Sequence, residues 1–142
     1  MSLIEKAFLL KESPLFSNLN LDELLSISDK LELISFKKGS AIFNQSQDAT
    51  RLFLIVEGSV DIKSKEGEKL AILSEGEIFG DEALFSDKPR AYSALASSNV
   101  KILTLTRSHL LAIIDECPSV ALNFLEAYSS QWEFRPRRTK KD

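Results

Sequence analysis

The most constraining feature of this chain is a series of short apolar runs between residues 33 and 106, each closed by turn-forming residues. Pairs such as Lys38-Gly39, Glu57-Gly58 and Glu75-Gly76 separate the runs. Residues 59–63 and 101–106 alternate with period two, the pattern of a strand with one face in water. Seven or eight short strands with regular turns predict a sandwich, barrel or jelly roll. The runs cover residues 33–36, 41–44, 51–56, 59–63, 69–73, 91–96 and 100–106.

Helical periodicity replaces this pattern on both sides. Asn20 followed by Glu23 three residues later has the pattern of a capping box ahead of an apolar stripe. Ser13-Pro14 ends the stretch before it, because a residue that precedes proline is disfavoured in a helix. Pro118 suits the first turn of the last helix. The helical segments expected are residues 3–10, 21–31, 110–114 and 120–132. The sequence therefore predicts a mainly β fold flanked by N-terminal and C-terminal α-helices.

Composition excludes several classes of protein. The 142 residues, 44% hydrophobic and 27% charged, suit one globular domain with a single core. Five basic and two acidic residues in 133–142 give a local +3, so the rest carries −6 of the net −3. Such an acidic body argues against direct nucleic-acid binding. One cysteine and one histidine are too few for a disulfide, a zinc site or the metal centre of a cupin enzyme.

Membrane and export signals are also missing from the sequence. No apolar run approaches the roughly eighteen residues of a transmembrane segment, and the first ten residues lack the pattern of a secretion signal. We expect a cytoplasmic protein, or the cytoplasmic part of a larger or membrane-attached one.

Chemistry is concentrated in residues 78–93. Gly80 follows a predicted strand and opens a single helical turn, whose first backbone N–H groups lack internal partners and suit an anion. Gly80 removes the side chain that would hold a ligand away, and Arg90 at the start of the next strand supplies a permanent charge. These features fit a phosphate, and the carboxylate of Asp81 fits the hydroxyl of an attached sugar. A loop closed by an ion pair between Arg90 and Asp81 or Glu82 fits the same residues.

Phe79-Gly80-Asp81, followed by Ala83-Leu84 and Pro89-Arg90-Ala91, resembles the phosphate-binding cassette of cyclic-nucleotide-binding domains. Those domains occur in catabolite activator proteins, protein kinase A regulatory subunits and cyclic-nucleotide-gated channels. Ser13-Pro14-Leu15-Phe16, Lys38-Gly39 and residues 53–60 and 76–80 look like the family's opening helices and β-roll. The resemblance implies a double-stranded β-helix (jelly-roll) β-roll. We expect one domain over residues 1–132. Because Arg135-Pro136 ends the last helix and the remaining residues are polar and basic, we expect a basic linker or disordered tail over 133–142.

The resemblance implies a role for each position of the cassette. Arg90 would pair with the exocyclic oxygens of the cyclic phosphate, and backbone amides near Ala83 and Ala91 would bind the same group. Asp81 stands where the family usually has a glutamate that accepts a hydrogen bond from the ribose 2′-hydroxyl, and Gly80 lets the sugar approach. The expected ligand-binding set is Phe79, Gly80, Asp81, Glu82, Ala83, Leu84, Arg90, Ala91 and Tyr92, with Tyr128 and Trp132 as candidate base caps and no catalytic residue or metal ligand.

Three residues depart from the family pattern. Asp81 is one methylene shorter than glutamate, and Glu82 stands where an apolar residue is common. Tyr92 replaces a small residue, and its bulk either enters the pocket or turns away from it.

The resemblance implies a regulatory domain rather than an enzyme. It would bind a cyclic nucleotide, with cAMP expected ahead of cGMP, and would relay binding through its C-terminal helices to a partner or a downstream effector domain beyond residue 142. The departures at Glu82 and Tyr92 motivate an alternative, a degenerate domain of the same fold that binds no cyclic nucleotide and acts as a protein-interaction module. A DNA-binding helix-turn-helix would belong to a longer parent protein. The apolar stripe of the last helix suits packing on the roll or a homodimer.

Overall fold

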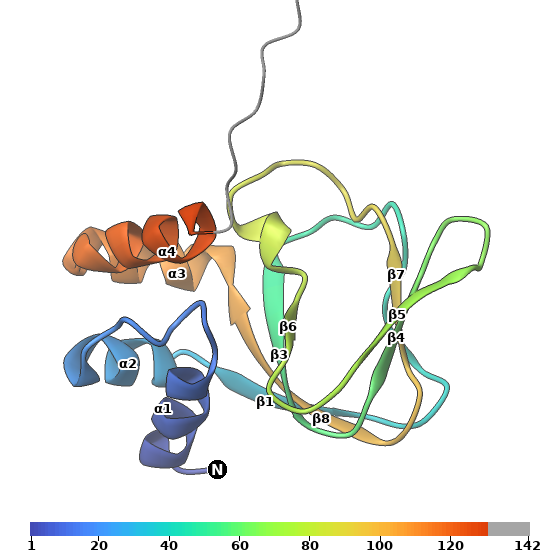
Figure 1. The fold of residues 1–142 in the computed structure, drawn as a ribbon, viewed down its shortest axis with the longest axis horizontal. Helices are drawn as coiled ribbons and strands as arrows, with labels where there is room; N and C mark the ends of the chain where they lie inside the picture. The colour runs from blue at the N-terminus through green and yellow to red at the C-terminus, as the bar shows by residue number, and fades with distance from the viewer. Residues whose placement is uncertain (131–142) are drawn as a thin grey trace, which may run out of the picture.

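The computed structural model describes residues 1–130, which form two antiparallel sheets with four helices gathered on one side of them (Figure 1). The helices are α1 (Leu3–Glu12), α2 (Leu21–Ser28), α3 (Arg107–Glu116) and α4 (Ser119–Ser129), with a single-turn 3-10 helix η1 (Asp81–Leu84). The strands are β1 (Glu32–Phe36), β2 (Ala41–Phe43), β3 (Arg51–Glu57), β4 (Val60–Lys63), β5 (Lys69–Leu73), β6 (Ile78–Phe79), β7 (Ser93–Ala96) and β8 (Val100–Thr106). The predicted mainly β jelly-roll fold with flanking helices is confirmed.

The two sheets have the strand orders β1-β8-β3-β6 and β2-β7-β4-β5, so neighbours in a sheet come from distant parts of the chain. All seven predicted strands are present, and the short β6 joins β3 through Phe53 and Leu54. β7 begins at Ser93, so the prediction that Arg90 starts this strand is wrong. The backbone of Arg90 instead exchanges hydrogen bonds with Ser46 and Gln47, which holds it in the loop before the strand.

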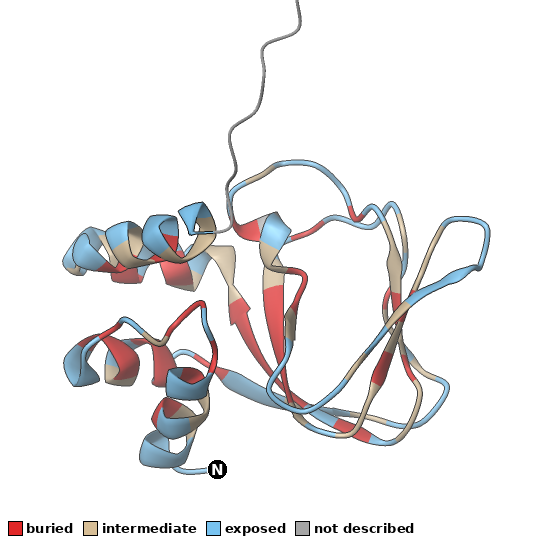
Figure 2. Ribbon diagram, in the orientation of Figure 1, coloured by how far each residue is buried: buried red, intermediate tan, exposed pale blue. Residues whose placement is uncertain are grey.

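Strand β3 divides the core into two clusters because its side chains alternate between two buried faces. Leu52 and Leu54 belong to the cluster under the helices, whereas Phe53 and Ile55 belong to the cluster between the sheets. Figure 2 shows buried residues along β3 and β8, where helices cover the outer face. The predicted water-facing side of residues 101–106 is therefore wrong, since Ile102 to Leu105 are all buried there. β4, with alternating buried and half-buried residues, follows the predicted pattern.

The predicted capping box of α2 is present and also reaches the C-terminal helices. Asn20 and Glu23 exchange hydrogen bonds of 2.9 Å in both directions. The second carboxylate oxygen of Glu23 accepts a hydrogen bond of 2.6 Å from the Ser119 hydroxyl at the start of α4. Glu23 is only 5% exposed, so this contact anchors the first turn of α4 to the N-terminal helices.

Two sequence predictions fall on residues beyond 130. The continuation of the last helix to Trp132 and the basic tail over 133–142 lie outside the described residues. Within residues 1–130, every helix is too short or too polar to cross a lipid bilayer.

Candidate functional site

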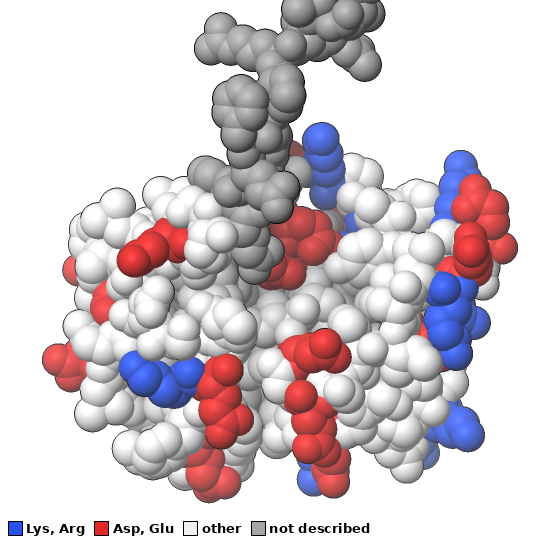
Figure 3. All heavy atoms as spheres, in the orientation of Figure 1, with Lys and Arg blue, Asp and Glu red and all other residues white. Residues whose placement is uncertain are grey.

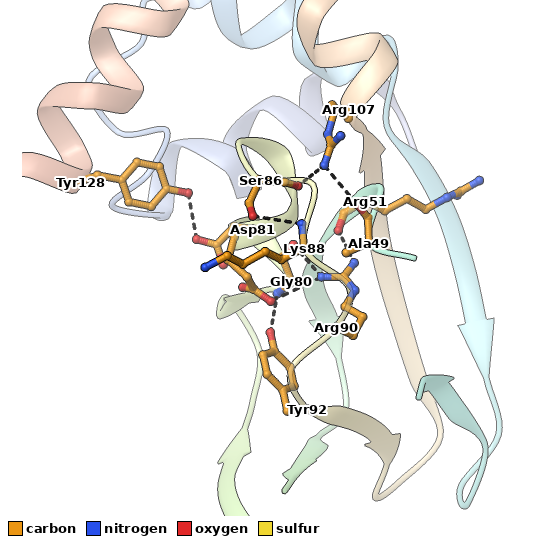
Figure 4. Close-up of polar contacts among 11 residues, drawn as sticks. Ala49, Arg51, Gly80, Asp81, Ser86, Lys88, Arg90, Tyr92, Arg107 and Tyr128 are labelled. Carbon is orange, nitrogen blue, oxygen red and sulfur yellow. Dashed lines mark hydrogen bonds and ion pairs between the residues drawn. The ribbon is translucent and has the colours of Figure 1, made fainter. Parts of the chain in front are cut away.

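The candidate site forms where β6 runs into η1 and the loop that precedes β7 crosses beside it (Figure 4). Gly80 links β6 to η1 in the left-handed conformation, with φ +74°. The predicted helical turn after Gly80 is present in the tighter 3-10 form. Phe79 is buried between the sheets and Leu84 under the helices, so the turn is fixed to both clusters of the core.

Gly80 and Arg90 are in direct contact. The Nη1 of Arg90 donates a hydrogen bond of 2.9 Å to the carbonyl oxygen of Gly80. A Cβ atom on Gly80 would lie 2.9 Å from that nitrogen and 3.0 Å from Cδ2 of Phe53. Glycine is therefore required at this position by both its backbone angle and the packing around it.

The guanidinium of Arg90 is buried, with 4% of the residue exposed. Its Nη2 donates a hydrogen bond of 2.6 Å to the carbonyl oxygen of Arg51, and its Cζ lies 4.2 Å from the ring centroid of Phe43. Burial lowers the pKa of Arg90, although a guanidinium keeps its charge at neutral pH. The Nε atom is buried and has no hydrogen-bond partner within the described part of the chain.

Glu82 and Tyr92 lie against the same cradle. The Oε1 atom of Glu82 is 3.4 Å from the Nη1 of Arg90, and its side chain is 53% exposed. The phenol oxygen of Tyr92 accepts a hydrogen bond of 3.0 Å from the backbone N–H of Gly80. Burial, followed by the charge of Glu82, raises the pKa of Tyr92. The bulk of Tyr92 thus enters the cradle, and the ion pair of Arg90 is with Glu82.

Asp81 lies on the other side of η1 and faces α4. The hydroxyl of Tyr128 donates a hydrogen bond of 2.9 Å to the Oδ2 atom of Asp81 (Figure 4). Burial raises the pKa of Asp81, and the hydrogen bond from Tyr128 opposes that rise. Tyr128, a candidate base cap, is therefore engaged with the acid predicted to face the sugar. Trp132, the other candidate, lies outside the described residues.

The remaining predicted positions are close in sequence to the cradle. Ala91 is exposed beside Arg90, and the side chain of Ala83 is outside what the structure describes.

Sequence reasoning missed several residues that shape the cradle. Phe43 supplies the ring over Arg90, and Arg51 contributes its carbonyl oxygen. Arg107, at the start of α3, pairs with Asp87 at 2.9 Å and donates to the carbonyl oxygen of Ser86, which fixes the loop between η1 and Arg90. No local signal identifies them, because backbone carbonyls accept two of the contacts and the partners are distant in sequence.

Hollows lie on both sides of the cradle. One of about 420 Å³ is lined by Phe43, Thr50, Arg51 and Arg90 among others, and one of about 520 Å³ by Asp81, Glu82, Phe85 and Tyr128 among others. Both volumes fall in the range of small-molecule sites, about 300–1,000 Å³. In Figure 3, acidic side chains gather along the boundary between the helices and the β-roll.

The fold and the site define a class of domain, a helix-flanked β-roll in which one turn brings a glycine, two acids and a buried arginine together. The cyclic nucleotide-binding domain family matches residues 33–117. This chain belongs to that family.

Curated relatives agree with this assignment. The chain is 38% identical over 91 residues to the cAMP-dependent protein kinase regulatory subunit of Mycosarcoma maydis, a match covering 62% of this chain and 17% of that protein. It is 34% identical over 99 residues to the subunit of the same name from Aspergillus fumigatus, covering 69% and 24%. The matched region thus spans at most about a quarter of the length of these relatives.

Solved structures are similar over most of the chain. The N-terminal domain of a transcriptional regulator from Streptomyces coelicolor A3(2) has a TM-score of 0.80 and 26% identity, covering 87% of this chain and 89% of that one. The Catabolite Activator Protein of Thermus thermophilus has a TM-score of 0.72 and 31% identity, covering 84% and 58%.

Proposed function

We propose that this domain is a regulatory module, not an enzyme, that binds a cyclic nucleotide with the cyclic phosphate on Arg90. The observation that carries the proposal is the buried and incompletely paired environment of this guanidinium. It is buried, its Nε lacks a partner among the described residues, and its ion pair is with a half-exposed carboxylate at 3.4 Å. A buried charge is costly unless it is well paired, and a phosphate offers two oxygens to the edge of a guanidinium.

The ligand class follows from the neighbours of Arg90. Asp81, one residue beyond Gly80, provides an acceptor for a sugar hydroxyl on the far side of η1 from the arginine. The fungal relatives named above are regulatory subunits of cAMP-dependent kinases, which favours cAMP ahead of cGMP.

Output would pass through α4. Its first turn is anchored by Glu23, and its last turn contacts the site through the hydrogen bond of Tyr128 to Asp81. A sugar hydroxyl that binds Asp81 shares its carboxylate with Tyr128, which now donates to Oδ2. A ligand that takes this oxygen displaces Tyr128 and so changes the contact that holds the end of α4. A partner or a downstream effector domain would sense this change, to the extent that the ligand prefers one arrangement of α4.

A ligand titration tests the proposal. Thermal unfolding and calorimetry would be measured with cAMP, cGMP and cyclic dinucleotides, and a ligand at 100 times its Kd should stabilise the fold by about 2.7 kcal/mol. Arg90→Lys, which keeps the charge but loses the forked donor geometry, should weaken binding by at least about tenfold. Lys65→Gln removes an exposed positive charge from the tip of the β4–β5 hairpin and should leave binding nearly unchanged. No stabilisation at millimolar cyclic nucleotide, or binding that is equal in Arg90→Lys, would refute the proposal.

A second function is favoured by one observation. Glu82 and Tyr92 already engage Arg90 and the N–H of Gly80, as expected for a degenerate domain that serves as a protein-interaction module. Absence of cyclic-nucleotide binding to the folded wild-type domain would support that function.

A further inference from the structure

We infer that Glu82 and Tyr92 together form an internal occupant of the phosphate cradle, and that an incoming cyclic nucleotide has to displace the Glu82 carboxylate. This inference rests on the proposed function and names the residues that set affinity at the same site.

The two side chains engage the donors that a phosphate would use. The carboxylate of Glu82 lies 3.4 Å from Nη1 of Arg90. The phenol oxygen of Tyr92 takes the N–H of Gly80, the backbone donor at the entry to η1, at 3.0 Å. Both side chains come from the segment that forms the cradle, so they reach these donors without movement of a distant element.

The charge of Glu82 acts on two neighbours in the cradle. Its carboxylate pairs with the Nη1 of Arg90, and after burial its charge is the next cause that raises the pKa of the Tyr92 phenol, whose oxygen accepts from the Gly80 N–H. Glu82 is therefore held at the cradle by its ion pair with Arg90.

The two residues differ in how readily they leave. The ring of Tyr92 packs against Phe43 at a centroid distance of 5.4 Å, within the aromatic cluster between the sheets. Glu82 has a side chain that is 53% exposed and can turn toward solvent. A phosphate close to Arg90 places a second negative charge beside Glu82, and like charges at this distance repel. Glu82 is thus the group that exchanges with ligand, while Tyr92 stays and narrows the space beside it.

Calorimetric titration with cAMP of the wild type and three variants tests the inference. Glu82→Gln keeps the shape of the side chain and removes the competing charge, so cAMP should bind about tenfold tighter, a difference of about 1.4 kcal/mol. Tyr92→Phe keeps the ring and frees the Gly80 N–H, and should tighten binding about threefold, at the low end of what one hydrogen bond contributes. Glu66→Gln removes a carboxylate from the exposed tip of the β4–β5 hairpin and is the matched control, with no change expected beyond twofold. Equal or weaker binding by Glu82→Gln would overturn the inference.

A measurement without nucleotide separates this inference from the proposed function. In a double-mutant cycle of Glu82→Gln with Arg90→Met, followed by urea unfolding, the unfolding equilibrium constant of the double variant should differ by about fivefold from the product of the two single fold-changes. If Arg90→Met does not fold, the cycle of Glu82→Gln with Tyr92→Phe measures the coupling between the carboxylate and the neighbouring phenol. If the double-mutant cycle shows coupling but no variant binds cAMP, the proposed function is refuted and the internal occupant is supported. Absence of coupling would remove the internal occupant whatever the nucleotide does.

Discussion

Replacement of Gly80 by alanine tests whether the cradle depends on the close approach of Arg90. Two separate effects of the new methyl group lower the free energy of unfolding. The backbone at Gly80 has φ +74°, and a left-handed conformation costs an L-residue about 1–2 kcal/mol. The added Cβ would also lie 2.9 Å from the Nη1 of Arg90 and 3.0 Å from the ring of Phe53. Both neighbours are buried and packed together, so neither yields easily, and crowding of this kind costs about 1–3 kcal/mol.

Gly67 provides a control in which only the strain of the left-handed backbone acts. Its φ is +84°, close to that of Gly80, but an added Cβ would meet nothing within 4 Å. Gly67→Ala should therefore lose about 1–2 kcal/mol of stability, whereas Gly80→Ala should lose about 2–5 kcal/mol. The difference between the two variants isolates the contact with Arg90 and Phe53.

Urea unfolding followed by circular dichroism measures both free energies, and thermal unfolding gives an independent check. For a domain of 142 residues, each kcal/mol lowers Tm by about 3 °C, so Gly80→Ala should melt about 3–9 °C below Gly67→Ala. If the two variants agree within about 0.5 kcal/mol, the packing of Arg90 against Gly80 contributes nothing and this reasoning is refuted.

Two further predictions concern Asp81. Tyr128→Phe keeps the ring beside Phe85 but removes the hydrogen bond to the carboxylate, so it should cost about 1–2 kcal/mol and raise the pKa of Asp81 further, measured by NMR titration. An unchanged pKa would contradict the contact. Because burial raises the pKa of Asp81 above 3.8 in the fold, ionisation opposes folding, and wild-type stability should fall relative to Asp81→Asn as pH rises from about 3.8 through the raised pKa. Parallel stability curves of the two proteins between pH 3.5 and 7, from urea unfolding, would refute the assignment.

Patterns local in sequence predicted the fold well. Short apolar runs closed by turn-forming residues located seven strands, and the spacing of Asn20 and Glu23 predicted a capping box that the structure contains. Gly80 and Arg90 were predicted as one site, and they are in contact. Each of these features depends on a residue type that can be recognised in the sequence, such as a glycine in a turn or an asparagine at the start of a helix.

The failures arise where distant groups decide the outcome. β8 lost its expected water-facing side because helices cover it, and the position of Arg90 depends on backbone hydrogen bonds with Ser46 and Gln47. The carbonyl of Arg51 and the hydroxyl of Tyr128 reach the site from 39 and 47 residues away. A carbonyl oxygen is present at every residue, so no residue type in the sequence marks its use.

The single-turn helix η1 points the adjacent carboxylates of Asp81 and Glu82 in different directions. A 3-10 helix has about three residues per turn, so neighbouring side chains diverge by about 120°. Asp81 consequently faces Tyr128 of α4, while Glu82 faces Arg90 inside the roll. In the proposed function, the phosphate of a ligand replaces the contact between Glu82 and Arg90, which lies within the cradle. The sugar of the ligand changes the contact between Asp81 and Tyr128, which connects the site to α4. Substitutions at Glu82 should therefore change affinity without altering the position of α4, whereas the loss of the Tyr128 hydroxyl should alter α4 even without ligand.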